Sequence, residues 1–122
     1  MSTTTSTLYD RLGRREGIAR ITHTLIDKHL ASPVVGVRFR AADRGKLERL
    51  AIEFFCAGSG GPEAYTGRDM RATHQGMNVS EQEFVAVVDD AMAALEAHGI
   101  EPATRNEVLG VLWSLKGEVL RL

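Results

Sequence analysis

Apolar residues recur every three or four positions along most of the chain, which is the spacing of one face of an α-helix. The first long segment with this pattern runs from Arg15 to Ser32, and Pro33 closes it because the residue before a proline disfavours helical backbone angles. A short helical turn precedes this segment and ends at Gly13. The apolar positions of the long segment are Ile18, Ile21, Leu25 and Ile26.

Two capping signals mark the next long helices. Asp43 can cap a helix that the run GSGGP, residues 58–62, brings to an end. Ser80, followed three residues later by Glu83, predicts a capping box at the start of a further helix that reaches Gly99. The apolar stripes of these two helices are Leu47, Leu50, Ala51 and Phe54, and Phe84, Val87, Val88, Ala91 and Leu95.

A last helix starts near Pro102, a residue that suits a first helical turn, and we expect it to continue through Val108 and Val119 to the C-terminus. No segment shows the alternation of a β-strand. Four amphipathic helices with short links predict an all-α fold in which two helix pairs cross. We expect residues 1–7, rich in serine and threonine, to be a disordered tail and residues 8–122 to form the domain.

Length and charge narrow the function classes. The 122 residues suit one domain, and 15 Lys and Arg against 16 Asp and Glu give a net charge of −1. The charges are dispersed, which argues against a nucleic-acid partner. The single cysteine, Cys56, excludes an internal disulfide and a cysteine-rich zinc site, and we expect it to be buried. Because no stretch has the length of a membrane span, we expect a cytoplasmic protein that binds no membrane. We also expect it to be a monomer.

One histidine stands in an otherwise apolar stripe. Met70, His74 and Met77 fall at i, i+4 and i+7 in a short helix-like segment, which Thr66 and Asp69 would open as a capping box. A buried imidazole needs a partner for each ring nitrogen. Two interpretations are open: carbonyl or hydroxyl partners in a packed core, or a metal on one nitrogen while the other donates a hydrogen bond backward.

Other motifs lack the context of a catalytic site. The histidines at positions 23, 29, 74 and 98 do not have the spacing of a zinc protease. The GSGGP run is followed by no Lys-Ser or Lys-Thr pair and preceded by no strand, so it is a loop rather than a phosphate cradle. No serine or cysteine stands in a recognised triad context. Zinc, phosphate and hydrolase chemistry therefore have no support.

A single imidazole is too few ligands for a bare transition metal, but it suffices for iron that a porphyrin already holds. A porphyrin needs apolar walls and, for its two carboxylates, cations or hydroxyls at one edge. The predicted walls are Phe39, Leu47, Phe54 or Phe55, Met70 and Phe84. The edge candidates are Tyr65, Thr66, Arg68 and Arg71, and the alternative for each arginine is a solvated helix face.

Several motifs occur together and in order around this histidine. The run GGPEAYTGRDMRATHQGMN contains it, and the opening LYDRLG with EGI, the RF pair of the corner, EFF and VSEQEF accompany it. In these motifs, from about Leu8 to the end, the chain resembles the group I truncated haemoglobins. The resemblance implies a truncated globin, a two-over-two helical sandwich, with one haem b whose iron is bound by His74.

The resemblance also implies which residues surround the haem. It assigns Phe39 to the aromatic that packs on the haem face, gives contacts to Phe55 and Phe84, and places Met70 and Tyr65 before the iron ligand. With the residue-level candidates included, the predicted haem contacts are Phe39, Leu47, Phe55, Tyr65, Met70, Arg71, His74 and Phe84.

On the distal side the chain departs from the best-known members of that family. The resemblance places Ile26 where many members have a tyrosine, Ala51 where many have a glutamine, and Leu47 at the gate. A donor stabilises the negative charge that dioxygen acquires on ferrous haem by ~1.5–3 kcal/mol. Its absence predicts oxygen retention that is weaker by roughly ten- to a hundredfold.

Four polar residues near these distal positions are further candidates. His23 and His29 lie about one turn on either side of Ile26, and Lys46 and Arg49 flank the gate leucine. Each could offer a donor, and a histidine could offer a second axial ligand. The alternative is that all four are surface residues.

Three function classes remain. The first is a haem protein that reversibly binds dioxygen, nitric oxide or carbon monoxide, as in oxygen transport. The second is an enzyme, either a nitric oxide dioxygenase served by an external reductase or a protein with a peroxidase side activity; electron transfer and gas sensing are variants. The third is a haem-free interaction module in which His74 is only packed. The aromatic residues around one imidazole favour the first class, and the apolar distal wall counts against the second.

Overall fold

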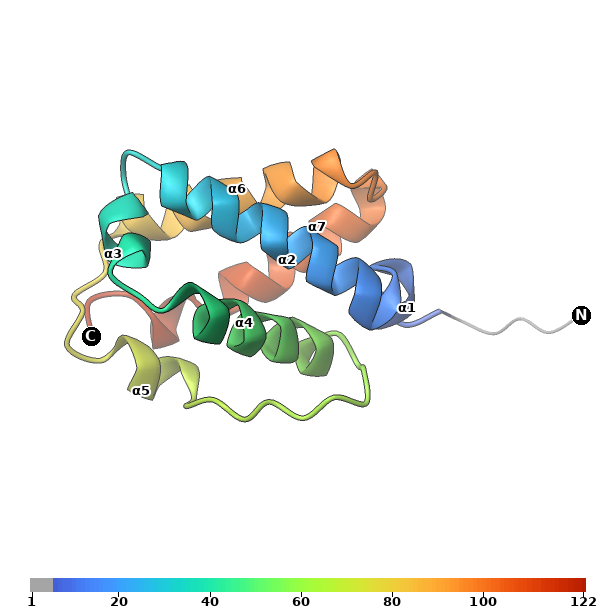
Figure 1. The fold of residues 1–122 in the computed structure, drawn as a ribbon, viewed down its shortest axis with the longest axis horizontal. Helices are drawn as coiled ribbons and strands as arrows, with labels where there is room; N and C mark the ends of the chain where they lie inside the picture. The colour runs from blue at the N-terminus through green and yellow to red at the C-terminus, as the bar shows by residue number, and fades with distance from the viewer. Residues whose placement is uncertain (1–5) are drawn as a thin grey trace, which may run out of the picture.

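The computed structural model describes residues 6–122, which are helical except for their links (Figure 1). The long helices are α2 (Arg14–Ala31), α4 (Arg44–Gly58), α6 (Glu81–Ala97) and α7 (Pro102–Ser114). The short helices are α1 (Leu8–Arg11), α3 (Gly36–Arg40), α5 (Met70–His74) and the 3-10 helix η1 (Lys116–Glu118). Within this part of the chain the only β-type pairing is a single bridge, so the all-α prediction is confirmed.

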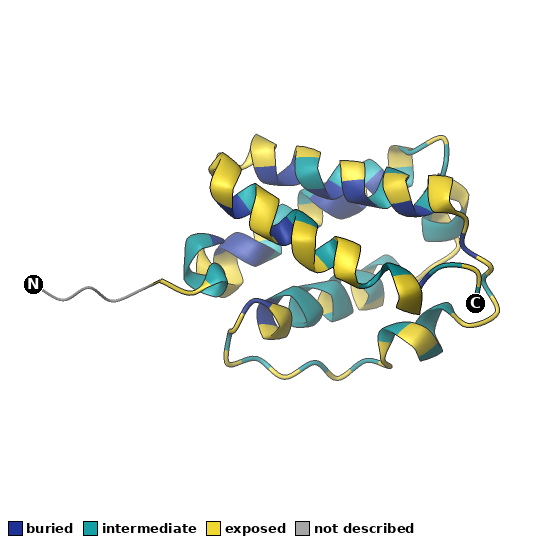
Figure 2. Cartoon of the chain, turned by 180° about the vertical axis from the view of Figure 1, so that it is seen from behind, coloured by how far each residue is buried: buried dark blue, intermediate teal, exposed yellow. Residues whose placement is uncertain are grey.

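The long helices form two pairs. α2 packs on α4, α6 packs on α7, and contacts between α2 and α6 join the pairs. Figure 2 shows that the buried residues of these helices face inward and the exposed ones outward. In Figure 1, α4 lies between α2 and α5, and a long link connects the end of α4 to α5.

Two of the predicted helix starts are confirmed by their caps. The Asp43 side chain accepts a hydrogen bond from the Lys46 amide at 3.2 Å and so begins α4. Ser80 and Glu83 form the predicted capping box of α6, since each side chain accepts a bond from the other residue's amide.

The predicted capping box of the histidine helix is wrong. Asp69 caps α5 alone, accepting from the Ala72 amide at 2.7 Å. Thr66 instead donates to Glu53 through both its amide and its hydroxyl, at 2.9 and 2.6 Å. Thr66 therefore binds the carboxylate of Glu53 in α4 and does not cap α5.

The N-terminal and C-terminal predictions are affected differently. Residues 1–5 of the predicted tail lie outside the described residues, while Thr7 caps α1. The last helix does not continue to the C-terminus: α7 ends at Ser114, and one short 3-10 helix follows. This prediction is wrong because the backbone beyond η1 pairs with another segment.

That partner segment is the stretch that follows α5. The amides of Gly76 and Asn78 both donate to the Leu122 carbonyl, at 3.0 and 2.9 Å, and the Arg121 amide donates to Val79 at 3.0 Å. Asn78 and Arg121 adopt left-handed backbone angles, with φ of 50° and 57°. Such angles are uncommon outside glycine, so these bonds hold the backbone in a shape that it does not prefer.

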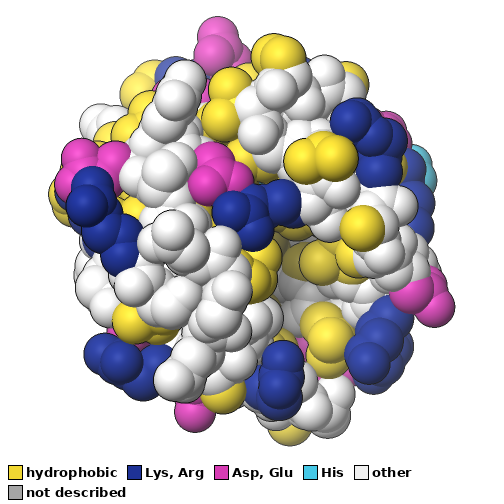
Figure 3. All heavy atoms as spheres, turned by 90° about the vertical axis from the view of Figure 1, so that its left-hand side faces the viewer, with side chains coloured by type: hydrophobic (Ala, Val, Ile, Leu, Met, Phe, Trp, Pro, Cys, Tyr) yellow, Lys and Arg dark blue, Asp and Glu magenta, His cyan; other side chains and the backbone are white. Residues whose placement is uncertain are grey.

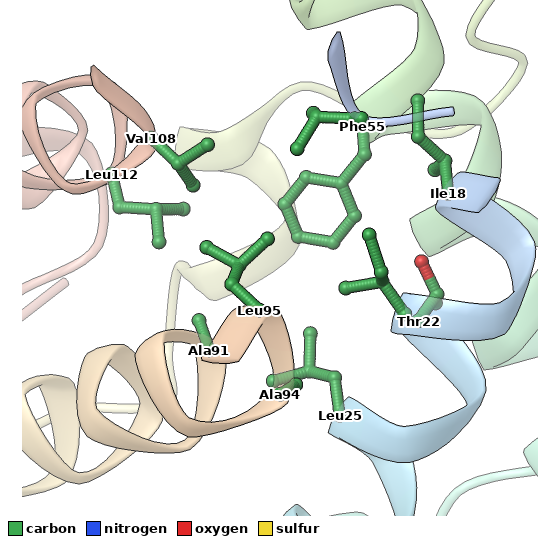
Figure 4. Close-up of a pocket in the computed structure, with 11 residues that line it drawn as sticks. Ile18, Thr22, Leu25, Phe55, Ala91, Ala94, Leu95, Val108 and Leu112 are labelled. Carbon is green, nitrogen blue, oxygen red and sulfur yellow. The ribbon is translucent and has the colours of Figure 1, made fainter. Parts of the chain in front are cut away.

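The core lies between the long helices and contains Cys56, which is fully buried as predicted. Burial raises the pKa of its thiol. The other buried residues of this cluster are Leu12, Ile18, Leu95 and Val108. Beside them is a small apolar cavity of about 30 Å³, shown in Figure 4, whose lining includes the unpaired, buried hydroxyl of Thr22.

His29 is buried, so its placement at the surface is wrong. Its side chain is only 4% exposed, its ring stacks on Phe39 with centroids 4.5 Å apart, and Nδ1 lies 2.8 Å from an Asp90 carboxylate oxygen. Burial lowers the pKa of His29 below its usual 6.5, and Asp90 opposes part of that change. His23, by contrast, is exposed and pairs with Glu48 at 2.9 Å.

This pKa direction predicts a pH dependence of stability. Below pH 6.5 the unfolded chain binds a proton at His29 that the folded chain resists. The free energy of unfolding therefore decreases as the pH drops toward the pKa of His29 in the folded protein. We predict that His29→Gln reduces this slope by up to ~1.4 kcal/mol per pH unit in urea unfolding between pH 7 and 5. Equal slopes for His29→Gln and the wild-type protein would contradict the prediction.

Candidate functional site

His74 is the last residue of α5 and lies half-buried at the wall of a large cavity. Its Nδ1 is 2.7 Å from the carbonyl oxygen of Met70, one turn earlier. Because a carbonyl can only accept, Nδ1 carries a proton, and in the neutral ring Nε2 keeps a free lone pair. The hydrogen bond thus leaves one nitrogen available as a metal ligand and orients the ring that carries it.

The cavity has a volume of about 690 Å³, within the usual range of cofactor sites. Figure 3 looks onto the end of the molecule where α3 and α5 lie and shows a hollow with hydrophobic side chains inside and Lys and Arg side chains around it. All the predicted wall residues line the cavity: Phe39, Leu47, Phe54, Phe55, Met70 and Phe84. Further apolar lining residues are Leu50, Val79, Val87, Val88, Leu112, Leu115 and Val119.

Neighbouring rings support two of the aromatic walls. His29 stacks on Phe39 from behind, and Trp113 makes an edge contact with Phe84 at 5.6 Å between ring centroids. Trp113 is 47% exposed and was not singled out by the sequence pattern, because its position in α7 lies between the apolar residues that define the stripe. These contacts limit the rotation of the two phenyl rings toward the cavity.

The structure brings two of the three predicted distal residues to the cavity. Leu47 and Ala51, both from α4, line the cavity, whereas Ile26 does not. No side chain of α2 lines it, and Ile26, 2% exposed, is buried in the packing of that helix. His23 and His29 are also on α2 and stay outside the cavity, so neither is placed to be a second axial ligand.

Two cations flank the gate leucine in the lining. Lys46 and Arg49 both line the cavity. Arg49 pairs with Glu53 at 3.5 Å, and within residues 6–122 Lys46 forms no ion pair. Leu47 and Ala51 between them bring no hydrogen-bond donor, so the wall is apolar where they stand.

The predicted edge residues divide into three that line the cavity and one that does not. Tyr65, Thr66 and Arg68 line it, but Arg71 is exposed and turned away. Met70 and His74, four residues apart, share the cavity side of α5, and the next position along the helix points about 100° away from Met70. The structure therefore does not bring Arg71 to the cavity lining.

The two edge hydroxyls are already committed within the protein. The Tyr65 hydroxyl donates to the Arg68 carbonyl at 2.5 Å, and the Thr66 hydroxyl donates to Glu53. The bonds from Thr66 lower the pKa of Glu53. Among the described residues neither Arg68 nor Lys46 forms an ion pair, so both of these lining cations are available to an anionic group.

The described residues contain no cluster of three or more His, Cys, Asp or Glu side chains that could hold a bare metal ion. They also include no helix with both the length and the apolar character needed to cross a bilayer. The metal chemistry of the cavity therefore depends on one imidazole and on a cofactor that supplies the remaining ligands.

Comparison with known proteins identifies that cofactor. The family model for bacterial-like globins matches residues 7–121. The chain belongs to the bacterial-like globin family. A group 1 truncated haemoglobin from Mycolicibacterium paratuberculosis is 31% identical over 114 residues, covering 93% of this chain and 84% of the relative.

Solved structures agree with this assignment. The ferric truncated haemoglobin of Tetrahymena pyriformis superposes with a TM-score of 0.92 at 26% identity and covers 96% of this chain and 100% of its own. A 2/2 haemoglobin from Synechococcus, 24% identical, has the same fold with a TM-score of 0.87 and covers 94% and 98%. The predicted truncated globin fold, a two-over-two sandwich, is confirmed.

The cofactor of this globin is haem b, as the resemblance implied. The cavity fits it: one imidazole has its lone pair free, the walls are apolar, and the lining includes the cations Arg68 and Lys46. Haem would bring the iron and four nitrogen ligands, and His74 could offer a further nitrogen from the cavity wall.

The edge cations give a matched pair of variants. We predict that Arg68→Ala raises the rate of haem transfer to excess apomyoglobin by about two- to fivefold, the effect of losing one partly exposed ion pair. Arg71→Ala should leave the rate unchanged, since Arg71 does not line the cavity. Equal effects of the two substitutions would contradict the assignment of Arg68.

Proposed function

We propose that this globin reversibly binds neutral diatomic gases, dioxygen among them, at haem iron whose axial protein ligand is His74. The observation that carries the proposal is the bond from Nδ1 to the Met70 carbonyl, which leaves Nε2 free at the wall of a haem-sized apolar cavity. A histidine that only packs in a core would be surrounded by side chains, whereas His74 borders this large cavity.

Ferrous haem supplies an open coordination position that a diatomic gas can occupy. The protein contributes to the cavity lining an apolar wall at Leu47 and Ala51 and the aromatic ring of Phe39. Such a wall offers water no hydrogen bonds, so it favours small apolar ligands over water and anions. Carbon monoxide and nitric oxide need little polar stabilisation, whereas dioxygen gains substantially from a donor. We therefore propose that the cavity favours the first two gases relative to dioxygen.

Nitric oxide dioxygenase activity is the alternative, and it needs dioxygen to be retained until nitric oxide arrives. The wall at Leu47 and Ala51 provides no donor for that retention, so gas binding is the function that we favour. An external reductase, a monomeric state and a cytoplasmic location remain predictions.

Replacement of the ligand tests the central assignment. We predict that His74→Gly loses the ferrous five-coordinate spectrum of an imidazole-bound haem and that added imidazole restores it, because the deleted ring leaves room for the free base. His23→Ala, on the exposed side of α2, should match the wild type in absorption. An unchanged His74→Gly spectrum without imidazole would refute the role of His74.

Restoring a donor tests the reading of the distal wall. We predict that Ala51→Gln slows dioxygen release by about ten- to a hundredfold in stopped-flow experiments, the effect of one hydrogen bond to a charged acceptor. Carbon monoxide release should change much less. Ala51→Leu adds comparable bulk without a donor and controls for steric effects; if it slows dioxygen release as much as glutamine does, the donor argument fails.

A further inference from the structure

Arg38, which the sequence pattern did not single out, connects two parts of the cavity wall. It lies in α3 beside Phe39, and it reaches residues 39 and 45 positions further along the chain. Nε and Nη2 form a forked ion pair with the Glu83 carboxylate, with 3.2 Å between Nη2 and Oε1. Nη2 also donates to the Met77 carbonyl oxygen at 3.1 Å.

This contact is stronger than an ordinary surface pair. The side chains of Arg38 and Glu83 are 31% and 18% exposed, and both line the cavity. The bonds from Arg38 lower the pKa of Glu83 to about 2, so the carboxylate is charged at neutral pH. A planar guanidinium that meets a carboxylate through two donors is held in both distance and orientation.

The position of this contact matters because α5 cannot hold itself. α5 has five residues, and a helix of that length is unstable without tertiary contacts. The chain leaves His74 through an extended residue and then Gly76, whose φ is +86°. Arg38 donates its hydrogen bond to Met77, which lies only three residues beyond His74.

Other contacts hold the same segment but not to the same wall. The residues beyond η1 bond to Gly76, Asn78 and Val79, and none of these bonds involves α3. Among the hydrogen bonds of residues 6–122, only the one from Arg38 to Met77 joins the stretch after His74 to the corner that carries Phe39. Through Glu83 it also fixes the start of α6, where Phe84 lines the cavity.

A second interpretation of Arg38 is that it binds a haem carboxylate. Its Nε and Nη2 donors are already used by Glu83 and Met77, whereas Arg68 and Lys46 also line the cavity and form no ion pair within residues 6–122. The geometry therefore favours a tie between protein segments over an anion site.

We propose that Arg38 is a positioning residue of the haem site: its bonds to Glu83 and to the Met77 carbonyl hold the His74 segment at a fixed separation from Phe39 and so slow haem loss. The inference rests on the proposed role of His74 as the iron ligand. It assigns to one side chain a part of haem retention that involves no contact with the iron.

The test compares two arginines of the haem-loaded protein. Arg38→Met keeps the apolar stem and removes the bonds, and it should speed haem transfer to apomyoglobin by about ten- to a hundredfold. Arg38→Lys, which keeps the charge but not the fork, should fall between. Arg44→Met is the matched control: Arg44 pairs with Asp27 at 2.8 Å and Glu48 at 3.3 Å, outside the cavity lining, and its loss should leave haem transfer unchanged.

Two further readouts separate positioning from general destabilisation. In Arg38→Met the iron–histidine stretching band of the ferrous protein should broaden, and the amides of Gly76 and Asn78 should exchange hydrogen faster, while Arg44→Met should change neither. Haem dimethyl ester decides between the two interpretations of Arg38. The effect of Arg38→Met should persist with the ester, and its disappearance would show that Arg38 binds a carboxylate and overturn the proposal.

The outcomes distinguish this inference from the proposed function. A wild-type protein that takes up no haem, or an His74→Gly variant with an unchanged spectrum, would refute both. A loaded wild type that loses haem as fast as Arg38→Met would overturn the positioning role alone. If Arg38→Met does not fold, Glu83→Gln carries the test, because glutamine keeps an oxygen that can accept from the Ser80 amide and removes the charge that holds Arg38.

Discussion

The hydrogen bond from His74 Nδ1 to the Met70 carbonyl is the interaction on which the site depends. It decides which ring nitrogen is free and fixes the plane of the ring within one helical turn. An imidazole that donates to a carbonyl is also a better electron donor through its other nitrogen. The direction of that second nitrogen determines whether the large cavity, with its aromatic walls and lining cations, can serve a metal cofactor.

The segment that carries this bond is the least self-sufficient part of the fold. α5 is one turn long, and its position comes from elsewhere: the Asp69 cap, the pairing of residues 76–79 with the end of the chain, and the guanidinium of Arg38. The long helices, in contrast, are stabilised by burial of their apolar stripes, and α4 and α6 also by their own side-chain caps. The protein thus places its chemistry on a short segment fixed by long-range polar contacts, supported by a scaffold fixed by local signals.

This division explains what the sequence could predict. The starts of α4 and α6 followed from Asp43 and the Ser80–Glu83 box, because capping is local chemistry that a few adjacent residues determine. The cavity walls followed from aromatic residues on apolar stripes. His74 could be recognised because it interrupts such a stripe.

Three of the errors have one physical origin, the competition of distant partners for local groups. Thr66 looked like a cap but is bonded to Glu53, and His29 looked like a surface residue but pairs with Asp90 under Phe39. The last helix stops because its downstream backbone pairs with residues 76–79. None of these partners is adjacent in sequence, so no short pattern contains them, and the same holds for Arg38.

The burial of Cys56 limits the chemistry that is open to the protein's one thiol. It is the only sulfhydryl in the chain, it is fully buried, and its raised pKa keeps it protonated. A sulfur atom that is sealed and un-ionised is a poor target for nitrosation and cannot cross-link two molecules. Burial of Cys56 thereby protects the protein's one thiol from oxidative side reactions.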